Sequence, residues 1–69
     1  MNVSEMEELL RDETFTPFVL TTNDGFSLPI ASPRQTLVGI GMLVVKYEGR
    51  LYHVPLGAIS HIVHPGEHL

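Results

Sequence analysis

Histidine is the residue type in this sequence whose spacing comes closest to that of a metal site. His61 and His64 are separated by two residues, and His68 follows near the end of the chain. Imidazole binds zinc well, but the chain has no cysteine to supply thiolate ligands. Residues three apart on a strand point to opposite faces, so His61 and His64 would converge only if the chain curled at Pro65. We therefore expect no metal and no cofactor, and keep His61, His64 and His68 as weak metal candidates.

Ser60 and His61 are adjacent and have the side chains of a nucleophile and a base. Neighbours on a strand point to opposite faces, whereas a nucleophile must lie within hydrogen-bond reach of its base. The sequence has no cysteine nucleophile and no glycine-rich phosphate loop. We predict that the protein is not an enzyme.

Histidine can also sense pH at an interface. His53 follows Tyr52 in a segment predicted to be a strand, where it is expected to be a pairing or interface residue. If copies associate, His53 and His61 could meet across the subunit boundary and make assembly depend on pH. Sedimentation of the same species at about pH 5.5 and about pH 7.5 would remove this hypothesis.

Basic side chains are few. The formal charge is −4, and five of the eight acidic residues lie in residues 1–13, which leaves the remainder neutral. Binding to nucleic acid through phosphates needs many lysines and arginines, so one copy offers too few, and no DNA binding is expected. An array of copies could concentrate them, with ordinary surface charge as the alternative. The candidate RNA-binding rim consists of Arg34, Gln35, Lys46 and Arg50.

The 69-residue length predicts one small domain that needs a further source of stability. A domain of this size buries only about 60% of the surface of its unfolded chain. Disulfides are excluded because there is no cysteine, which leaves self-association, and we expect a homo-oligomer. No apolar run is long enough to span a membrane, and the acidic N-terminus does not resemble a signal peptide. We expect a cytoplasmic protein with no membrane partner.

Hydrophobic periodicity predicts a short helix followed by five strands. Ser4 and Glu7 fit a capping box for a helix near residues 4–11, whose apolar stripe of Met6, Leu9 and Leu10 must dock on the rest of the domain. The strands are predicted near residues 15–22, 26–31, 36–47, 50–55 and 58–63, and residues 64–69 form a tail.

The register of the first hairpin follows from the need to keep its apolar residues on one face. A three-residue loop, Asn23-Asp24-Gly25 with a left-handed Gly25, pairs Leu20 with Leu28 and Phe18 with Ile30. Pro29 then points outward, which requires a bulge or an unpaired side of its strand.

The second hairpin turns at Glu48-Gly49, and the pattern leaves two-residue and three-residue loops open. The two-residue loop pairs Leu43 with Val54 but requires a positive φ at Glu48.

Residues 37–47 are apolar on both alternating faces and contain Gly39 and Gly41. Glycine inside a strand is expected where a sheet bends sharply, so we predict one long bent strand that serves both halves of a small barrel. An interface is the other explanation. Val38, Ile40 and Met42 are left to pack inside the subunit, under the helix or against a neighbour.

The predicted order, with a short helix, a long bent middle strand and a tight turn before the last strand, resembles the Sm-like fold. The run Ala-Ile-Ser-His-Ile-Val at 58–63 resembles the end of the bacterial host-factor Sm-like protein. The first half, Phe15-x-Pro17-Phe18-x-Leu20 followed by Asp24-Gly25, is also similar to small uncharacterised bacterial proteins of about this length.

The resemblance implies a mainly β fold, in which a short N-terminal α-helix precedes a five-stranded, strongly bent SH3-like or Sm-like barrel spanning residues 1–69. It also implies a ring, commonly of about six or seven copies, that binds single-stranded RNA. In such a ring the last strand of one copy pairs with the fourth strand of the next. The oligomer edge would then comprise Leu51, Tyr52, His53, Val54, Ile59, His61 and Val63.

Two segments depart from the family pattern. Pro55, Leu56 and Gly57 stand where the host factor carries a basic, aromatic and histidine cluster, and residues 32–35 lack the acidic residue and the asparagine that hold the base in Sm proteins. These departures concern the RNA site and not the fold. The prediction is therefore a noncatalytic homo-oligomeric Sm-like module whose RNA site differs from that of the family. The more specific hypothesis is a ring that binds single-stranded RNA weakly. The alternative is a protein-interaction or assembly module that does not bind nucleic acid.

Overall fold

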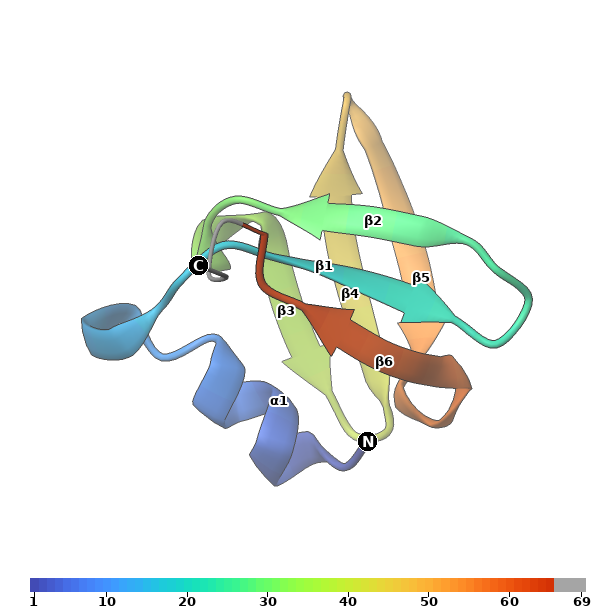
Figure 1. Ribbon diagram of the computed structural model, residues 1–69, viewed down its shortest axis with the longest axis horizontal. Helices are drawn as coiled ribbons and strands as arrows, with labels where there is room; N and C mark the ends of the chain where they lie inside the picture. Colours follow the sequence, from blue (N-terminus) through green and yellow to red (C-terminus); the bar gives the residue numbers. More distant parts are fainter. Residues whose placement is uncertain (66–69) are drawn as a thin grey trace.

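Two three-stranded antiparallel sheets cross one another around a single apolar core (Figure 1). The computed structural model describes residues 1–65. One sheet has the order β2-β1-β6 and the other β3-β4-β5. The strands are β1 (Phe18–Thr22), β2 (Ser27–Ile30), β3 (Thr36–Gly39), β4 (Met42–Tyr47), β5 (Arg50–Pro55) and β6 (Ile59–Val63).

The prediction of a mainly β fold with one short helix is confirmed. The predicted five-stranded barrel is not observed, because the described residues form six strands in two separate sheets, and no strand of one sheet pairs with a strand of the other. The predicted tail comprises residues 64–69 and follows the end of β6 at Val63. Its residues 66–69 lie outside the described residues.

Helix α1 (Val3–Leu9) begins earlier than predicted. Asn2 is the N-cap, and the capping box joins it to Glu5 instead of joining Ser4 to Glu7. Asn is as good an N-cap as Ser, so the earlier of two available boxes forms. The docking of the apolar stripe is confirmed: Met6 is fully buried, and Leu9 and Leu10 pack against the core.

The first hairpin has the predicted register. Leu20 lies opposite Leu28, and Gly25 in the loop has a φ of +90°. Pro29 is exposed on β2, which is an edge strand, so its missing N–H leaves no partner unsatisfied.

The predicted long strand at 36–47 is wrong, because the chain turns at Ile40 and Gly41 and forms the hairpin β3–β4. Gly39 pairs with Met42, and Gly41 has a φ of +72° that a side chain would disfavour. The many apolar residues of this stretch lie in three different environments. Leu43 is fully buried, Val38 packs on the core from the side, and the side chain of Ile40 is fully exposed.

The β4–β5 hairpin takes the two-residue loop, with Leu43 opposite Val54 and a φ of +51° at Glu48. This loop matches the twist of the flanking strands, which compensates for the positive φ at a residue with a side chain.

Three 3₁₀ helices account for the remaining differences at strand ends. They are η1 (Asp12–Thr14), η2 (Pro33–Gln35) and η3 (Leu56–Ala58). β1 begins only at Phe18, after η1 and Pro17, and β6 begins at Ile59 because Ala58 ends η3. The core comprises Met6, Phe18, Leu20, Leu28, Ile30, Leu43, Val45, Val54, Leu56 and Ile59.

Candidate functional site

The histidines proposed as metal candidates have separate partners. His61 Nδ1 lies 3.0 Å from Ser60 Oγ, whereas His64 Nδ1 lies 3.2 Å from Thr16 Oγ1. The His64 ring also packs edge-on against Phe18, with ring centroids 5.8 Å apart. His68 lies outside the described residues. Within residues 1–65 no group of three or more histidine or acidic side chains is placed to hold a metal ion.

The expectation that Ser60 and His61 point apart is wrong, since their side chains are within hydrogen-bond distance. The pairing of β6 with β1 shifts between Thr21 and Thr22, and this bulge interrupts the regular alternation of side chains. The Ser60 hydroxyl donates to the Thr21 carbonyl at 3.0 Å. A hydroxyl has one proton, so while Ser60 donates to Thr21 its contact with His61 requires Nδ1 to carry the hydrogen.

Three residues of the candidate RNA-binding rim meet in one shallow groove. Arg34, Gln35 and Lys46 line a cavity of about 380 Å³ together with Glu48. Arg50, the fourth rim residue, pairs with Tyr47 at the start of β5 and is not among the residues lining this cavity.

Gln35 is used by the fold. Its Oε1 accepts hydrogen bonds from the backbone N–H groups of Ala31 at 2.6 Å and Ser32 at 3.0 Å. Its Nε2 donates to the backbone carbonyl of Lys46 at 3.1 Å. The side chain therefore fastens the turn at η2 to β4, and its polar atoms are occupied.

Each sheet ends in a strand that belongs to the predicted oligomer edge. Among residues 1–65, β5 pairs only with β4, and β6 pairs only with β1. Leu51 on β5 is 64% exposed and Val63 on β6 is 48% exposed, and His53 and His61 are exposed as well. An unpaired strand with exposed apolar side chains is a template for pairing with another chain.

The remaining residues of that predicted edge face inward. Val54 and Ile59 are buried in the core, and Tyr52 is half-buried against it.

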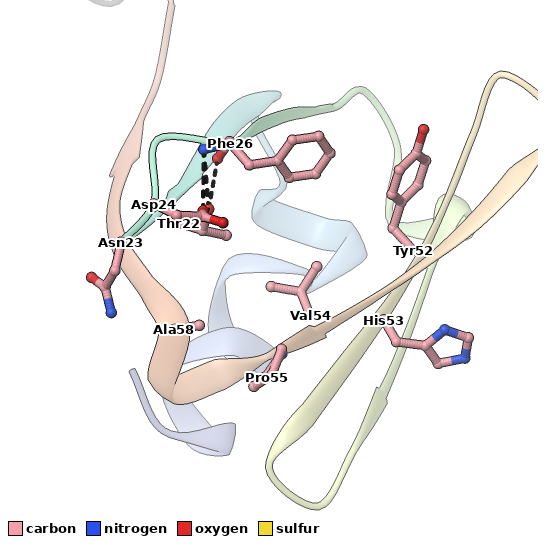
Figure 2. A pocket seen from close by; sticks show the side chains of 9 residues that line it. All are labelled: Thr22, Asn23, Asp24, Phe26, Tyr52, His53, Val54, Pro55 and Ala58. Carbon is pink, nitrogen blue, oxygen red and sulfur yellow. Dashed lines mark hydrogen bonds between the residues drawn. The ribbon is translucent and has the colours of Figure 1, made fainter.

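A cavity of about 420 Å³ lies between the β1–β2 loop and β5 (Figure 2). The rings of Phe26 and Tyr52 flank its mouth with centroids 5.6 Å apart, and Val54 lies below them. The His53 imidazole points away from this side of β5. The sequence pattern did not reveal this cavity, because Phe26 alternates with Leu28 and Ile30 like a core residue although its side chain is 43% exposed.

Asp24 rims this cavity and is held by the loop. Hydrogen bonds from the Thr22 hydroxyl and then from the Phe26 backbone N–H lower the pKa of its carboxyl below the ordinary value. The carboxylate thus stabilises the three-residue loop in its ionised form.

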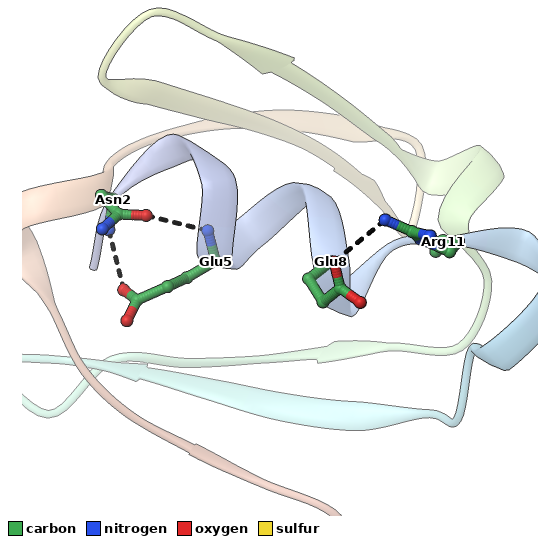
Figure 3. Close-up of polar contacts among 4 residues, drawn as sticks. All are labelled: Asn2, Glu5, Glu8 and Arg11. Carbon is green, nitrogen blue, oxygen red and sulfur yellow. Dashed lines mark hydrogen bonds and ion pairs between the residues drawn. The ribbon is translucent and has the colours of Figure 1, made fainter.

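A third groove, of about 550 Å³, separates α1 from β6. Leu9 and Ile62 give it an apolar wall. Glu5 and Glu8 line it from the helix: Glu5 accepts from the Asn2 N–H and Glu8 pairs with Arg11 at 3.0 Å (Figure 3). The groove therefore combines an apolar wall with two carboxylates, of which that of Glu8 is paired with Arg11, beside the outer edge of β6.

None of the helices within residues 1–65 has the length and apolar character required to cross a bilayer. Compared with models of protein families, with curated proteins and with solved structures, the chain matches none of them.

Proposed function

We propose that the protein is a noncatalytic, Sm-like assembly module that forms a homo-oligomer by pairing the β5 edge of one copy with the β6 edge of the next. The observation that carries the proposal is that β5 and β6 are edge strands of different sheets within residues 1–65, with Leu51 and Val63 exposed on them. Two different edges make a head-to-tail contact, which closes into a ring when the rotation between copies divides a full turn.

The order of elements supports the Sm-like part of the proposal. β2 and β3 are separated only by Ala31, Ser32 and η2, so residues 27–39 can be regarded as one strand bent at η2. The chain then consists of a helix, five strands and a 3₁₀ turn before the last strand, with the bend between the two sheets. The bent segment lies earlier than the stretch at 37–47 that the sequence pattern indicated.

The experiment compares the native mass of the full chain with that of Leu51→Asp. A charge on the β5 edge should shift the population to monomer, because an unpaired carboxylate would be buried between copies. Leu37→Asp is the matched control, since Leu37 is 71% exposed on β3 and belongs to neither edge of the contact. Equal masses for wild type and Leu51→Asp would refute the proposed contact.

Binding of single-stranded RNA is a second candidate, favoured by the joint position of Arg34 and Lys46 in one groove. A ring would repeat this weak basic site and raise its effective affinity. Fluorescence anisotropy with oligo-U and oligo-A at low salt tests it. We expect binding at micromolar ring concentration that the double variant Arg34→Ala/Lys46→Ala abolishes, and no binding by wild type would exclude RNA.

A further inference from the structure

The free backbone groups of β5 belong to alternate residues. Tyr47 and Arg50 flank a two-residue loop and therefore form a hydrogen-bonded pair. Hydrogen-bonded and non-bonded pairs alternate along an antiparallel ladder, so Leu51 and His53 direct their backbone groups away from β4. The bond from Leu56 N to Gly41 O, 3.0 Å long, continues this alternation beyond the strand.

The free backbone groups of β6 follow from the same rule. Thr22 donates its N–H to Phe26 O at 2.8 Å, so Thr22 faces β2 and its neighbour Thr21 faces β6. Thr21 pairs with His61, which therefore faces β1. Ile62 is left with backbone groups that face away from the sheet, whereas Ser60 is the extra residue of the bulge and the rule does not place it.

Hydrogen-bonded pairs between two copies can form only between residues whose backbone groups face outward. This requirement restricts the register of β5 against β6. Placing Leu51 opposite Ile62 keeps every residue of β6 alongside a residue of β5. A shift of two residues in one direction leaves Ile62 unpaired. A shift in the other direction sets Ile59 opposite Leu56, which belongs to η3 and lies beyond the end of β5.

This register determines which side chains share a face. Directly opposite residues project to the same face, so the exposed side chain of Leu51 lies beside Ile62, which lines the groove between α1 and β6. Lys46 is the partner of Leu51 in the β4–β5 hairpin and is exposed on the same face. The groove that receives Leu51 carries Glu5 and Glu8.

We infer that Leu51 of one copy inserts into the groove between α1 and β6 of a second copy, with Lys46 beside the carboxylates of Glu5 and Glu8. The occupant of the groove is thus another copy of this chain, and the inference rests on the proposed assembly. In the same register His53 and His61 project to opposite faces of the joint sheet. A direct contact between the two histidines, hypothesised from the sequence, is not part of this register.

Disulfide trapping tests the register cleanly because the chain has no cysteine. Arg50 and Val63 are both exposed and form a non-bonded pair in the inferred register, with Cα atoms about 4.5 Å apart, within the range of a disulfide. Co-expressed Arg50→Cys and Val63→Cys chains should form a covalent dimer on oxidation, whereas either variant alone should not. Leu51→Cys with Val63→Cys is the matched control, because these side chains would lie on opposite faces.

The outcomes separate the inference from the assembly itself. A stable oligomer in which Leu51→Cys links to Val63→Cys, and Arg50→Cys does not, would overturn the inference and leave the assembly standing. A monomeric wild-type protein would overturn both.

Charge exchange tests the groove. We expect Lys46→Glu to weaken association roughly tenfold and Lys46→Glu/Glu8→Lys to restore most of the affinity, with an effect that fades at high salt. Equal weakening in the double variant would contradict the placement of Lys46.

Discussion

Lys46 and Leu51 lie directly opposite one another on β4 and β5, and both side chains are on the exposed face of that sheet. An apolar and a cationic side chain thus stand side by side at the free edge of β5. The groove between α1 and β6 offers the complementary pair, an apolar wall and two carboxylates. Size adds a reason for association, because a domain of 69 residues has a small core.

Gly41 is predicted to be the most sensitive glycine of the β3–β4 turn. Its φ of +72° is disfavoured for any residue with a side chain, so Gly41→Ala should lower the free energy of unfolding by about 1–2 kcal/mol. Urea denaturation measures this loss. Gly57→Ala is the control, since Gly57 does not have a positive φ and has open space around it, and it should change stability by less than about 0.5 kcal/mol. Similar losses in both variants would contradict the assigned turn.

Gln35 is predicted to stabilise the fold and not to contact RNA directly. Gln35→Ala removes two accepted hydrogen bonds and one donated bond, and we expect a loss of about 1–3 kcal/mol in the free energy of unfolding. Gln35→Glu keeps the two accepted bonds and should lose less. If RNA binding is detected, its affinity should follow Arg34 and Lys46, and a specific loss in a fully folded Gln35→Glu variant would contradict this assignment.

Asp24 is predicted to make stability depend on acid pH. The pKa of its carboxyl is lower in the folded state, so its contribution is fully present above the ordinary pKa and is lost as the pH falls through the folded-state pKa. Asp24→Asn should therefore be less stable than wild type near neutral pH, and the difference should shrink below about pH 4. Thermal denaturation between neutral pH and about pH 2 measures it, and a difference that grew toward low pH would refute the assignment.

Met6 is predicted to fix the helix that forms one side of the groove. Its side chain is fully buried, so Met6→Ala should cost about 2–5 kcal/mol, a large share of the stability of so small a domain. Val3→Ala in the same helix is the control, because Val3 is 36% exposed and should contribute little. Circular dichroism with urea denaturation compares the two, and a tolerant Met6→Ala variant would show that α1 is not anchored through this residue.

The first hairpin could be predicted from sequence because its apolar residues, such as Leu20 and Leu28, agree with its turn residues on one register. The β3–β4 turn was missed because it consists of Ile40 and Gly41, contains no polar residue and lies inside an apolar run. The contact between Ser60 and His61 was missed for another reason. It depends on a bulge, and bulges break the alternation from which side-chain directions are predicted.

The surface grooves were also not predictable, since each joins residues that are distant along the chain. Ile62 and α1 line the same groove although they lie near opposite ends of the sequence. Gln35 contacts Lys46 only because η2 folds back on β4.

The solution mass of the full chain tests the central claim most directly. Sedimentation velocity at neutral pH and at micromolar to tens of micromolar concentration should give one dominant closed oligomer, whose mass is a whole multiple of 7.7 kDa. Closed assemblies do not grow with concentration once formed, so the sedimentation coefficient should stay constant over the upper part of this range. A protein that sediments as a 7.7 kDa monomer throughout would contradict the account.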